Sequence, residues 1–191
     1  EPQVRALAEA HEGVFYADGT HPMSAAEEPL ATVEELVVLA AHPKFVGIGE
    51  SGLDYHYSAD SAAIQQESLR IHIEAARRTG LPLIIHAREA DDDMARILRE
   101  ELRAGAYGCV MHCFSSTAAL AEAALDMGFY LSISGIAAFP KSGDLRAIFA
   151  ADADVDRGGL RLLRLHVVLL GEQLFGPALR RAFTQFIFCP H

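Results

Sequence analysis

The chain has 191 residues and a net charge of −10; 51% of its residues are hydrophobic and 22% are charged. These values are typical of a globular protein, and the length suits one domain that buries a sizeable core. The negative charge argues against a protein that coats nucleic acid electrostatically, although it leaves open an enzyme that binds phosphates through metal ions.

The sequence contains no membrane or secretion signal. No apolar run approaches the roughly 18 to 20 residues of a membrane span, and no signal-peptide pattern opens the chain. The three cysteines lack zinc-finger spacing, and Cys109 and Cys113 lie in an apolar run, so we expect buried free thiols in a reducing cytoplasm. The chain opens at Glu1 directly on a helical pattern, from which we expect a fragment or a trimmed chain.

Short apolar runs alternate with helical patterns along the chain. We predict strands near residues 13–17, 45–50, 82–87, 109–114 and 129–134, and a further strand near 164–170. Between them, helical patterns cover residues 31–43, 61–80, 91–102 and 116–128. The first of these helices begins with a capping box formed by Thr32 and Glu35, and Gly80 ends the second. Short strands that alternate with longer helices indicate βα units and a parallel sheet.

Two architectures fit such an alternation, a doubly wound sheet and a TIM-type (β/α) barrel. A doubly wound nucleotide-binding sheet usually shows a Gly-rich phosphate loop after its first strand, and this sequence shows none. Polar residues instead fall at the carboxyl ends of strands, where (β/α) barrels assemble their active sites. We therefore predict an α/β fold of the TIM-barrel type, in a single domain that spans residues 1–191.

Three polar residues stand at the ends of separate predicted strands: Glu50, His86 and His112. A single buried histidine on a strand is usually a hydrogen-bonded core residue. A carboxylate and two imidazoles that converge on one rim, however, are ligands that a divalent metal ion prefers. Such an ion lowers the pKa of bound water and polarises a phosphoryl or carbonyl oxygen. The pattern therefore predicts a metal site formed by these three residues.

Two further residues are candidates for substrate binding. His21 follows a strand and either lines the same rim or caps the next turn. Arg88 lies two residues after His86 and holds either an anionic substrate or a structural carboxylate. Asp54 and Tyr55 are interpreted as turn and packing residues. Surface or packing roles are expected for the histidines His42, His56, His72 and His166.

Four segments in order resemble the TatD family of metal-dependent hydrolases: VGIGESGLDYHY, LPLIIHAREA, VMHCFSS and GFYLSISGI. The match runs from about residue 10 to residue 148. The resemblance implies a (β/α) barrel enzyme that cleaves phosphodiester bonds in DNA, in single strands or at 3′ ends, without an obligate protein partner. It implies two divalent ions, Mg, Mn or Zn, with Glu50 as the catalytic residue that bridges them and His86 and His112 as ligands.

The sequence departs from the family pattern in two places. The family's first strand carries a His-x-His pair of ligands that this chain lacks, and the family's Glu-Thr-Asp motif is replaced by Glu172, Gln173 and Leu174. Residues 158–191 look unlike the family as a whole. We therefore expect a barrel that is incomplete or distorted at both ends, a site that holds metal loosely, and slower DNA cleavage than in a full-length member.

Two other functions remain open at this point. Similar rim ligands would also serve a metal-dependent amidohydrolase or phosphoesterase that acts on a small molecule. A chain that lacks ligands is also compatible with a non-catalytic remnant that binds a partner. Release of nucleotides from single-stranded DNA, hydrolysis of small esters or amides, and metal binding without turnover distinguish the three functions.

Overall fold

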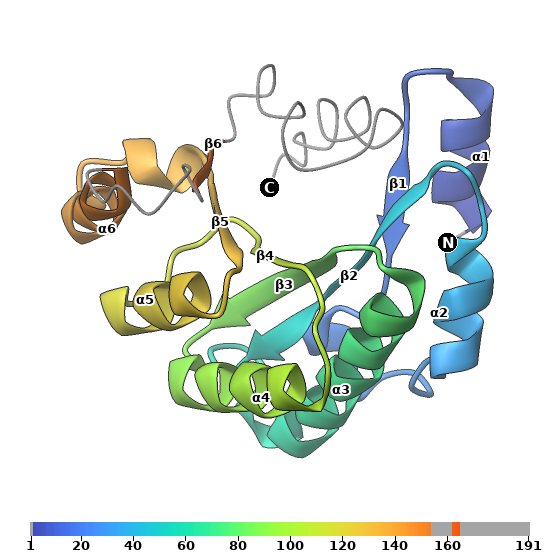
Figure 1. The fold of residues 1–191 in the computed structure, drawn as a ribbon, viewed down its shortest axis with the longest axis horizontal. Helices are drawn as coiled ribbons and strands as arrows, with labels where there is room; N and C mark the ends of the chain where they lie inside the picture. Colours follow the sequence, from blue (N-terminus) through green and yellow to red (C-terminus); the bar gives the residue numbers. More distant parts are fainter. Residues whose placement is uncertain (1, 154–161, 165–191) are drawn as a thin grey trace.

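Six parallel strands form one sheet, and neighbouring strands in the sheet are also neighbours in the chain (Figure 1). The computed structural model describes residues 2–153 and 162–164. The strands are β1 (Tyr16–Asp18), β2 (Phe45–Asp54), β3 (Leu83–Arg88), β4 (Cys109–Met111), β5 (Tyr130–Ile133) and β6 (Leu162–Arg164). This sequential order agrees with the predicted (β/α) barrel and not with a doubly wound sheet, whose strand order reverses at a switch point.

The two outer strands of the described sheet are β1 and β6. Within residues 2–153 and 162–164 they are not paired with each other. The predicted incompleteness of the barrel at both ends therefore stays a prediction. The strand predicted near 164–170 overlaps β6 at Arg164, and residues 165–170 lie outside the described part of the chain.

The strand β2 differs most from its prediction. The prediction ends it at Glu50, whereas β2 continues through Gly52 to Asp54. Its pairing with β3 shifts register between Ile48 and Ser51 and then resumes as far as Asp54 opposite Arg88. Gly49 and Gly52 have positive φ values and allow the backbone to stay paired with β3. Asp54 is consequently at the same sheet edge as Glu50.

Helices alternate with the strands as predicted. They are α1 (Pro2–Ala10), α2 (Val33–Ala40), α3 (Ala62–Thr79), α4 (Asp91–Ala104), α5 (Ala118–Asp126) and α6 (Gly143–Ala153), with 3₁₀ turns η1 (Pro22–Ser24), η2 (Ala59–Ser61) and η3 (Gly135–Ala138). The capping box is confirmed: Glu35 accepts from the Thr32 N–H at 2.7 Å, and Thr32 Oγ1 accepts from the Glu35 N–H. Gly80 ends α3 in the left-handed conformation, as predicted. No helix of the described residues has the length and apolarity needed to cross a membrane.

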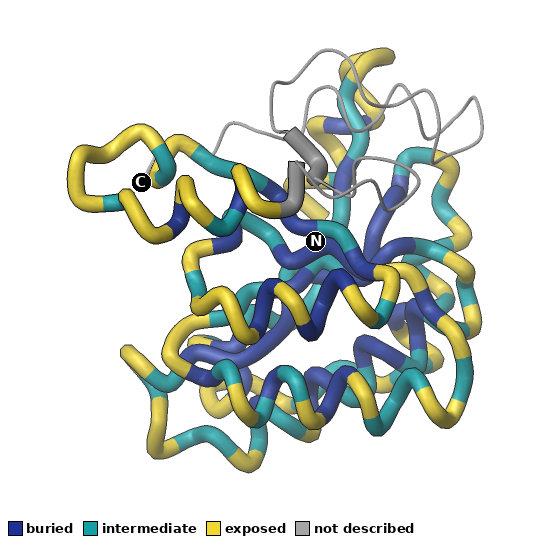
Figure 2. Tube along the Cα trace, turned by 60° about the vertical axis from the view of Figure 1, so that its left-hand side comes forward, coloured by how far each residue is buried: buried dark blue, intermediate teal, exposed yellow. Residues whose placement is uncertain are grey.

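Helices α2 to α5 cover one face of the sheet (Figure 1). The buried residues of the core lie between these helices and the sheet (Figure 2). On α3, Leu69, Ile73 and Ala76 are buried. On α4, Met94, Ile97 and Leu98 are buried as well. The burial of these apolar faces is the main favourable term that holds the helices on the sheet.

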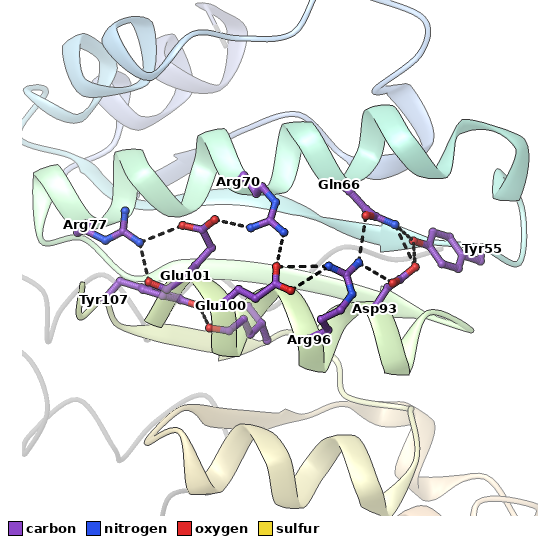
Figure 3. Close-up of polar contacts among 10 residues, drawn as sticks. Tyr55, Gln66, Arg70, Arg77, Asp93, Arg96, Glu100, Glu101 and Tyr107 are labelled. Atoms are coloured by element: carbon purple, nitrogen blue, oxygen red, sulfur yellow. Dashed lines mark hydrogen bonds and ion pairs between the residues drawn. The ribbon is translucent and has the colours of Figure 1, made fainter. Parts of the chain in front are cut away.

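The outer sides of α3 and α4 are joined by a row of charged side chains (Figure 3). Arg70 of α3 contacts Glu100 and Glu101 of α4, each at 2.5 Å, and Arg77 contacts Glu101 at 3.2 Å. Nearer the rim, Asp93 of α4 accepts a hydrogen bond from the Tyr55 hydroxyl at 2.9 Å. Because most of these groups are partly exposed, each pair contributes little stability, but the row aligns the two helices that flank β3.

Candidate metal centre

Three side chains that can ligate a metal converge on the carboxyl side of the first three strands. His21 comes from the segment after β1, Glu50 from β2 and His86 from β3. One ligand atom from each lies within 4.8 Å of those of the other two, and all three residues are partly buried. A carboxylate with two imidazoles at this spacing has the donor chemistry that a divalent ion such as Mn²⁺ or Zn²⁺ accepts. The residues present therefore fit a metal ion.

Glycines on either side of Glu50 bring β2 against β3. Gly49 and Gly52 have φ values of 131° and 145°, which residues with a side chain rarely adopt. A Cβ atom at Gly52 would lie 1.9 Å from the backbone oxygen of His86. The close backbone approach that these glycines permit sets the Glu50 carboxylate beside the His86 ring.

The His86 ring lies between two carboxylates. Its Nδ1 atom is 3.5 Å from Glu50 Oε1, and its Nε2 atom is 2.9 Å from Asp54 Oδ2. Burial disfavours a charge on this ring, but the hydrogen bonds and charges of Glu50 and Asp54 outweigh it and raise the pKa of His86. Burial likewise opposes ionisation of Glu50, yet the nearby histidines, His86 first, lower the pKa of Glu50.

Asp54 is a buried carboxylate that was interpreted as a turn residue. The turn role is confirmed, because its Oδ1 atom accepts from the Tyr57 N–H at 2.8 Å. Its second oxygen contacts His86, and this role was missed. Side chains alternate along a strand, so Glu50, Gly52 and Asp54 share one face of β2. This alternation could have placed Asp54 beside Glu50, but the predicted strand ends at Glu50 and so does not include Asp54.

His21 has both of the roles that its sequence context left open, because it caps the next turn and also lines the rim. Its Nδ1 atom accepts from the Met23 N–H at 3.3 Å and caps η1. Its ring also packs edge-on against His86, with the ring centroids 4.7 Å apart. Burial, and then the charge of His86, lower the pKa of His21. The structure thus groups His21 with the potential metal ligands, while its predicted contact with substrate stays a prediction.

His112 follows β4 and lies outside the group of three. Pairing of β4 ends at Met111, and Cys113 has a φ of 44°, so the chain turns earlier than the predicted strand end at residue 114. The His112 Nε2 atom lies 3.2 Å from Cys113 Sγ. The ring is still near enough to Glu50 to help lower the pKa of that carboxyl group. Its role as a ligand stays a prediction.

Arg88 ends β3 on the same side of the sheet as His86. Its guanidinium lies 4.7 Å from the centre of the Tyr57 ring, a distance typical of a cation–π contact. Burial opposes ionisation of Asp54, but the hydrogen bonds from the Tyr57 N–H and His86, the charge of His86 and, last, the charge of Arg88 outweigh it and lower the pKa of Asp54. Arg88 therefore places a cation at the rim beside the candidate centre, and its contact with substrate stays a prediction.

Comparison with known proteins assigns the chain to a family. The sequence model of the TatD related DNase family matches residues 2–157. The chain belongs to the TatD family. This confirms the resemblance that the four sequence segments indicated, from the strand that carries Glu50 to the segment that contains β5.

Curated relatives support the TatD assignment along the same part of the chain. The uncharacterized metal-dependent hydrolase YabD of Bacillus subtilis (strain 168) is 43% identical over 136 residues, which is 70% of this chain and 52% of YabD. The uncharacterized metal-dependent hydrolase TatD of Mycobacterium tuberculosis is 41% identical over 149 residues, 75% of this chain and 55% of the relative. The 3′-5′ ssDNA/RNA exonuclease TatD of Klebsiella pneumoniae (strain 342) is 27% identical over 150 residues, 78% and 57% of the two chains. The chain spans about half the length of these relatives.

Solved structures of TatD proteins share the fold. The structure of YjjV, a TatD homologue from Escherichia coli K12, superimposes with a TM-score of 0.69 at 29% identity, over 78% of this chain and 57% of YjjV. A TatD family hydrolase from Entamoeba histolytica gives a TM-score of 0.62 at 23% identity, over 78% and 52% of the two chains, and supports the fold alone. Together with the sequential parallel sheet, these likenesses confirm the predicted α/β fold class.

Proposed function

We propose that this chain is a metal-dependent hydrolase that cleaves phosphodiester bonds in DNA, with single strands or 3′ ends as its substrate. The observation that carries the proposal is the convergence of His21, Glu50 and His86, which come from three adjacent strands or the segments after them. Membership of the TatD family supports the hydrolytic chemistry. The name of the Klebsiella pneumoniae relative, 3′-5′ ssDNA/RNA exonuclease, supports a nucleic-acid substrate.

The side chains at this rim have separate roles in the proposal. When bound, a divalent ion supplies Lewis acidity at a phosphoryl oxygen and at water. Glu50 offers a carboxylate that can hold one ion or bridge two. His86 donates from Nε2–H to Asp54, which leaves the Nδ1 atom, on the Glu50 side, as its ligand atom. His21 supplies a second imidazole, and burial favours the neutral form that a ligand requires. Its Nδ1 atom accepts from the Met23 N–H, so binding of an ion through Nε2 would require the ring proton to move to Nδ1 and that hydrogen bond to break.

Two more residues extend the site toward substrate. His112 follows β4, the strand beside β3, and we propose that it joins the ligand set when a second ion binds. Arg88 carries a guanidinium, which matches phosphate oxygens in geometry and charge. Its contact with the Tyr57 ring holds that guanidinium at the rim. We therefore propose that Arg88 contacts a phosphate of the substrate.

The activity is proposed to be lower than that of a family member with the complete Glu-Thr-Asp motif. Leu174 stands where that motif carries its aspartate. Leucine can neither ligate a metal nor accept a proton, and loss of a positioned base typically lowers a rate by about 10²- to 10⁴-fold. Residue 174 lies outside the described residues, so this expectation rests on the sequence.

A nuclease assay tests the proposal. A single-stranded oligonucleotide labelled at its 5′ end is incubated with the purified chain and Mg²⁺ or Mn²⁺, and the products are resolved by length. Slow shortening that requires the metal is expected, and it should be lost in Glu50→Gln. The matched control is Glu67→Gln, which alters an exposed carboxylate on α3 and should leave the rate unchanged.

Three results would count against the proposal. Cleavage that survives Glu50→Gln would come from another site or from a contaminating nuclease. Hydrolysis of bis(p-nitrophenyl) phosphate without any cleavage of DNA would favour a small-molecule phosphoesterase. Binding of Mn²⁺ without turnover of any substrate would favour a non-catalytic remnant.

A further inference from the structure

Helix α3 packs against β2 (Figure 1) and buries three polar side chains, Gln65, Ser68 and His72. Gln65 and His72 are both fully buried. They are seven residues apart, so they lie on the same side of the helix. Buried polar groups are costly unless they are hydrogen-bonded. The partners of both side chains include backbone groups in segments that lead to the candidate metal centre.

His72 is hydrogen-bonded at both ring nitrogens. Its Nδ1 atom lies 2.7 Å from the carbonyl oxygen of Ser68, which can only accept, and its Nε2 atom lies 2.9 Å from the backbone nitrogen of Thr20, which can only donate. The proton is therefore on Nδ1, and Nε2 is the acceptor. Burial lowers the pKa of His72 and favours this neutral form. Thr20 immediately precedes His21, so the hydrogen bond fixes the backbone next to a potential ligand.

The same segment also lies against the backbone that carries Glu50. A Cβ atom on Gly19 would be 2.6 Å from the Cα of Gly49 and 3.0 Å from the His72 ring. Gly19 therefore packs closely on both the His72 ring and the strand just before Glu50. Together these two contacts set the position of His21 relative to Glu50.

Gln65 is likewise hydrogen-bonded to backbone groups, at the end of β2 that carries Asp54. Its Oε1 atom accepts from the Asp54 N–H at 2.8 Å, and its Nε2 atom donates to the oxygen of Ser58 at 2.8 Å. These bonds fix the end of β2, where Asp54 contacts His86. Helix α3 thus supports the segments beside both histidines of the candidate centre.

We propose that His72 is a positioning residue of the metal centre, which holds His21 beside Glu50 and His86 by accepting the Thr20 N–H. The inference rests on the proposed function in one respect, that these three side chains bind an ion. Packing alone would require only the volume of the ring. Positioning requires an acceptor at the place of Nε2, and this difference can be tested.

Two substitutions separate the two ring contacts. In His72→Gln the amide oxygen can take the place of Nε2 and accept from Thr20, whereas the contact with Ser68 is lost. In His72→Asn the amide nitrogen can take the place of Nδ1 and donate to Ser68, whereas the contact with Thr20 is lost. Mn²⁺ binding to the DNA-free chain is measured by titration calorimetry. We expect His72→Asn to weaken binding about 10- to 100-fold and His72→Gln to weaken it less than about threefold.

Equal weakening in the two variants, or none in either, would overturn the inference. If both variants fail to fold, the wild-type protein still provides a test, because the Thr20 amide should be protected from hydrogen exchange. Exchange of Thr20 as fast as that of an exposed loop amide would overturn the inference as well.

Failure of the proposed function gives a different result. If the wild-type chain does not bind Mn²⁺, the metal centre is absent, and the NMR signals of the His21 ring in the metal-free protein decide the inference. Displacement of these signals in His72→Asn but not in His72→Gln would support positioning. Unchanged signals in both variants would overturn it.

Discussion

The Nε2 atom of His86 lies 2.9 Å from Oδ2 of Asp54, a fully buried carboxylate at the end of the neighbouring strand. A carboxylate that accepts from one nitrogen of a histidine fixes the ring orientation and leaves the other nitrogen free for a metal. In this chain the other nitrogen is Nδ1, which faces Glu50. The buried side chain of Asp54 should therefore influence how strongly His86 binds a metal ion.

Asp54→Asn should weaken metal binding without unfolding the chain. The substitution keeps the size of the side chain but removes the charge that supports the His86 ring, and such partners typically change metal affinity about 10- to 100-fold. The measurement is Mn²⁺ titration of the two proteins at one pH. Asp60→Asn, at an exposed position in η2, is the control and should bind as the wild type does. An unchanged affinity in Asp54→Asn would show that His86 is oriented by other contacts.

His72 should make stability fall in mildly acidic solution. Burial lowers the pKa of His72 below its ordinary value of 6.5, so the unfolded chain takes up this proton before the folded chain does. The free energy of unfolding should therefore decrease as the pH falls below 6.5, until the folded-state pKa is reached. The slope contributed by this one group approaches about 1.4 kcal/mol per pH unit.

The difference in urea unfolding between wild type and His72→Gln isolates this contribution, because glutamine does not titrate. The difference should be constant above pH 7 and should shift against the wild type as the pH falls below 6.5. A difference that stays constant down to pH 5 would mean that His72 is not held in its neutral form.

Substitutions of three glycines should separate crowding from backbone strain. Gly52→Ala adds a Cβ atom 1.9 Å from the His86 oxygen at a φ of 145°, so it should cost roughly 3 kcal/mol or more. Gly80→Ala has open space at a φ of 71° and should cost only about 1 to 2 kcal/mol. Gly108→Ala has open space without a positive φ, and we expect little change. Chemical denaturation of the three variants gives the order, and a mild effect at Gly52 would contradict the close approach of β2 and β3.

The row of charges between α3 and α4 should contribute less to stability than the core beneath it. Arg70 and Glu100 are 37% and 40% exposed, so Arg70→Met should cost at most about 1 kcal/mol. Ile73 is fully buried on the same helix, and Ile73→Ala should cost about 2 to 5 kcal/mol. The measurement is the urea midpoint of each variant. A larger loss at Arg70 than at Ile73 would mean that the charged row acts as one cooperative network.

Local pattern was sufficient to predict much of the fold and part of the candidate site. Apolar runs and capping signals located the strands and helices, and the polar residues at strand ends directed attention to Glu50 and His86. The contact of Asp54 with His86 was missed because the predicted strand ends at Glu50, whereas β2 continues to Asp54. His72 was assigned to surface or packing, since its partner Thr20 is 52 residues away and no local period reveals that hydrogen bond. The turn after β4 depends on the positive φ of Cys113, which could not be predicted because cysteine rarely adopts such a conformation.

The sequential order of β1, β2 and β3 has a consequence for how the protein is made. His21, Glu50, Asp54, His72 and His86 all belong to the first half of the chain, and the strands that carry the site pair with their immediate predecessors. During synthesis the N-terminal part of a chain emerges first and can fold before the remainder is complete. We therefore expect nascent chains stalled once α4 has left the ribosome to show protected amides around the candidate centre. Assembly of His21, Glu50 and His86 would then precede the addition of β4, β5 and β6.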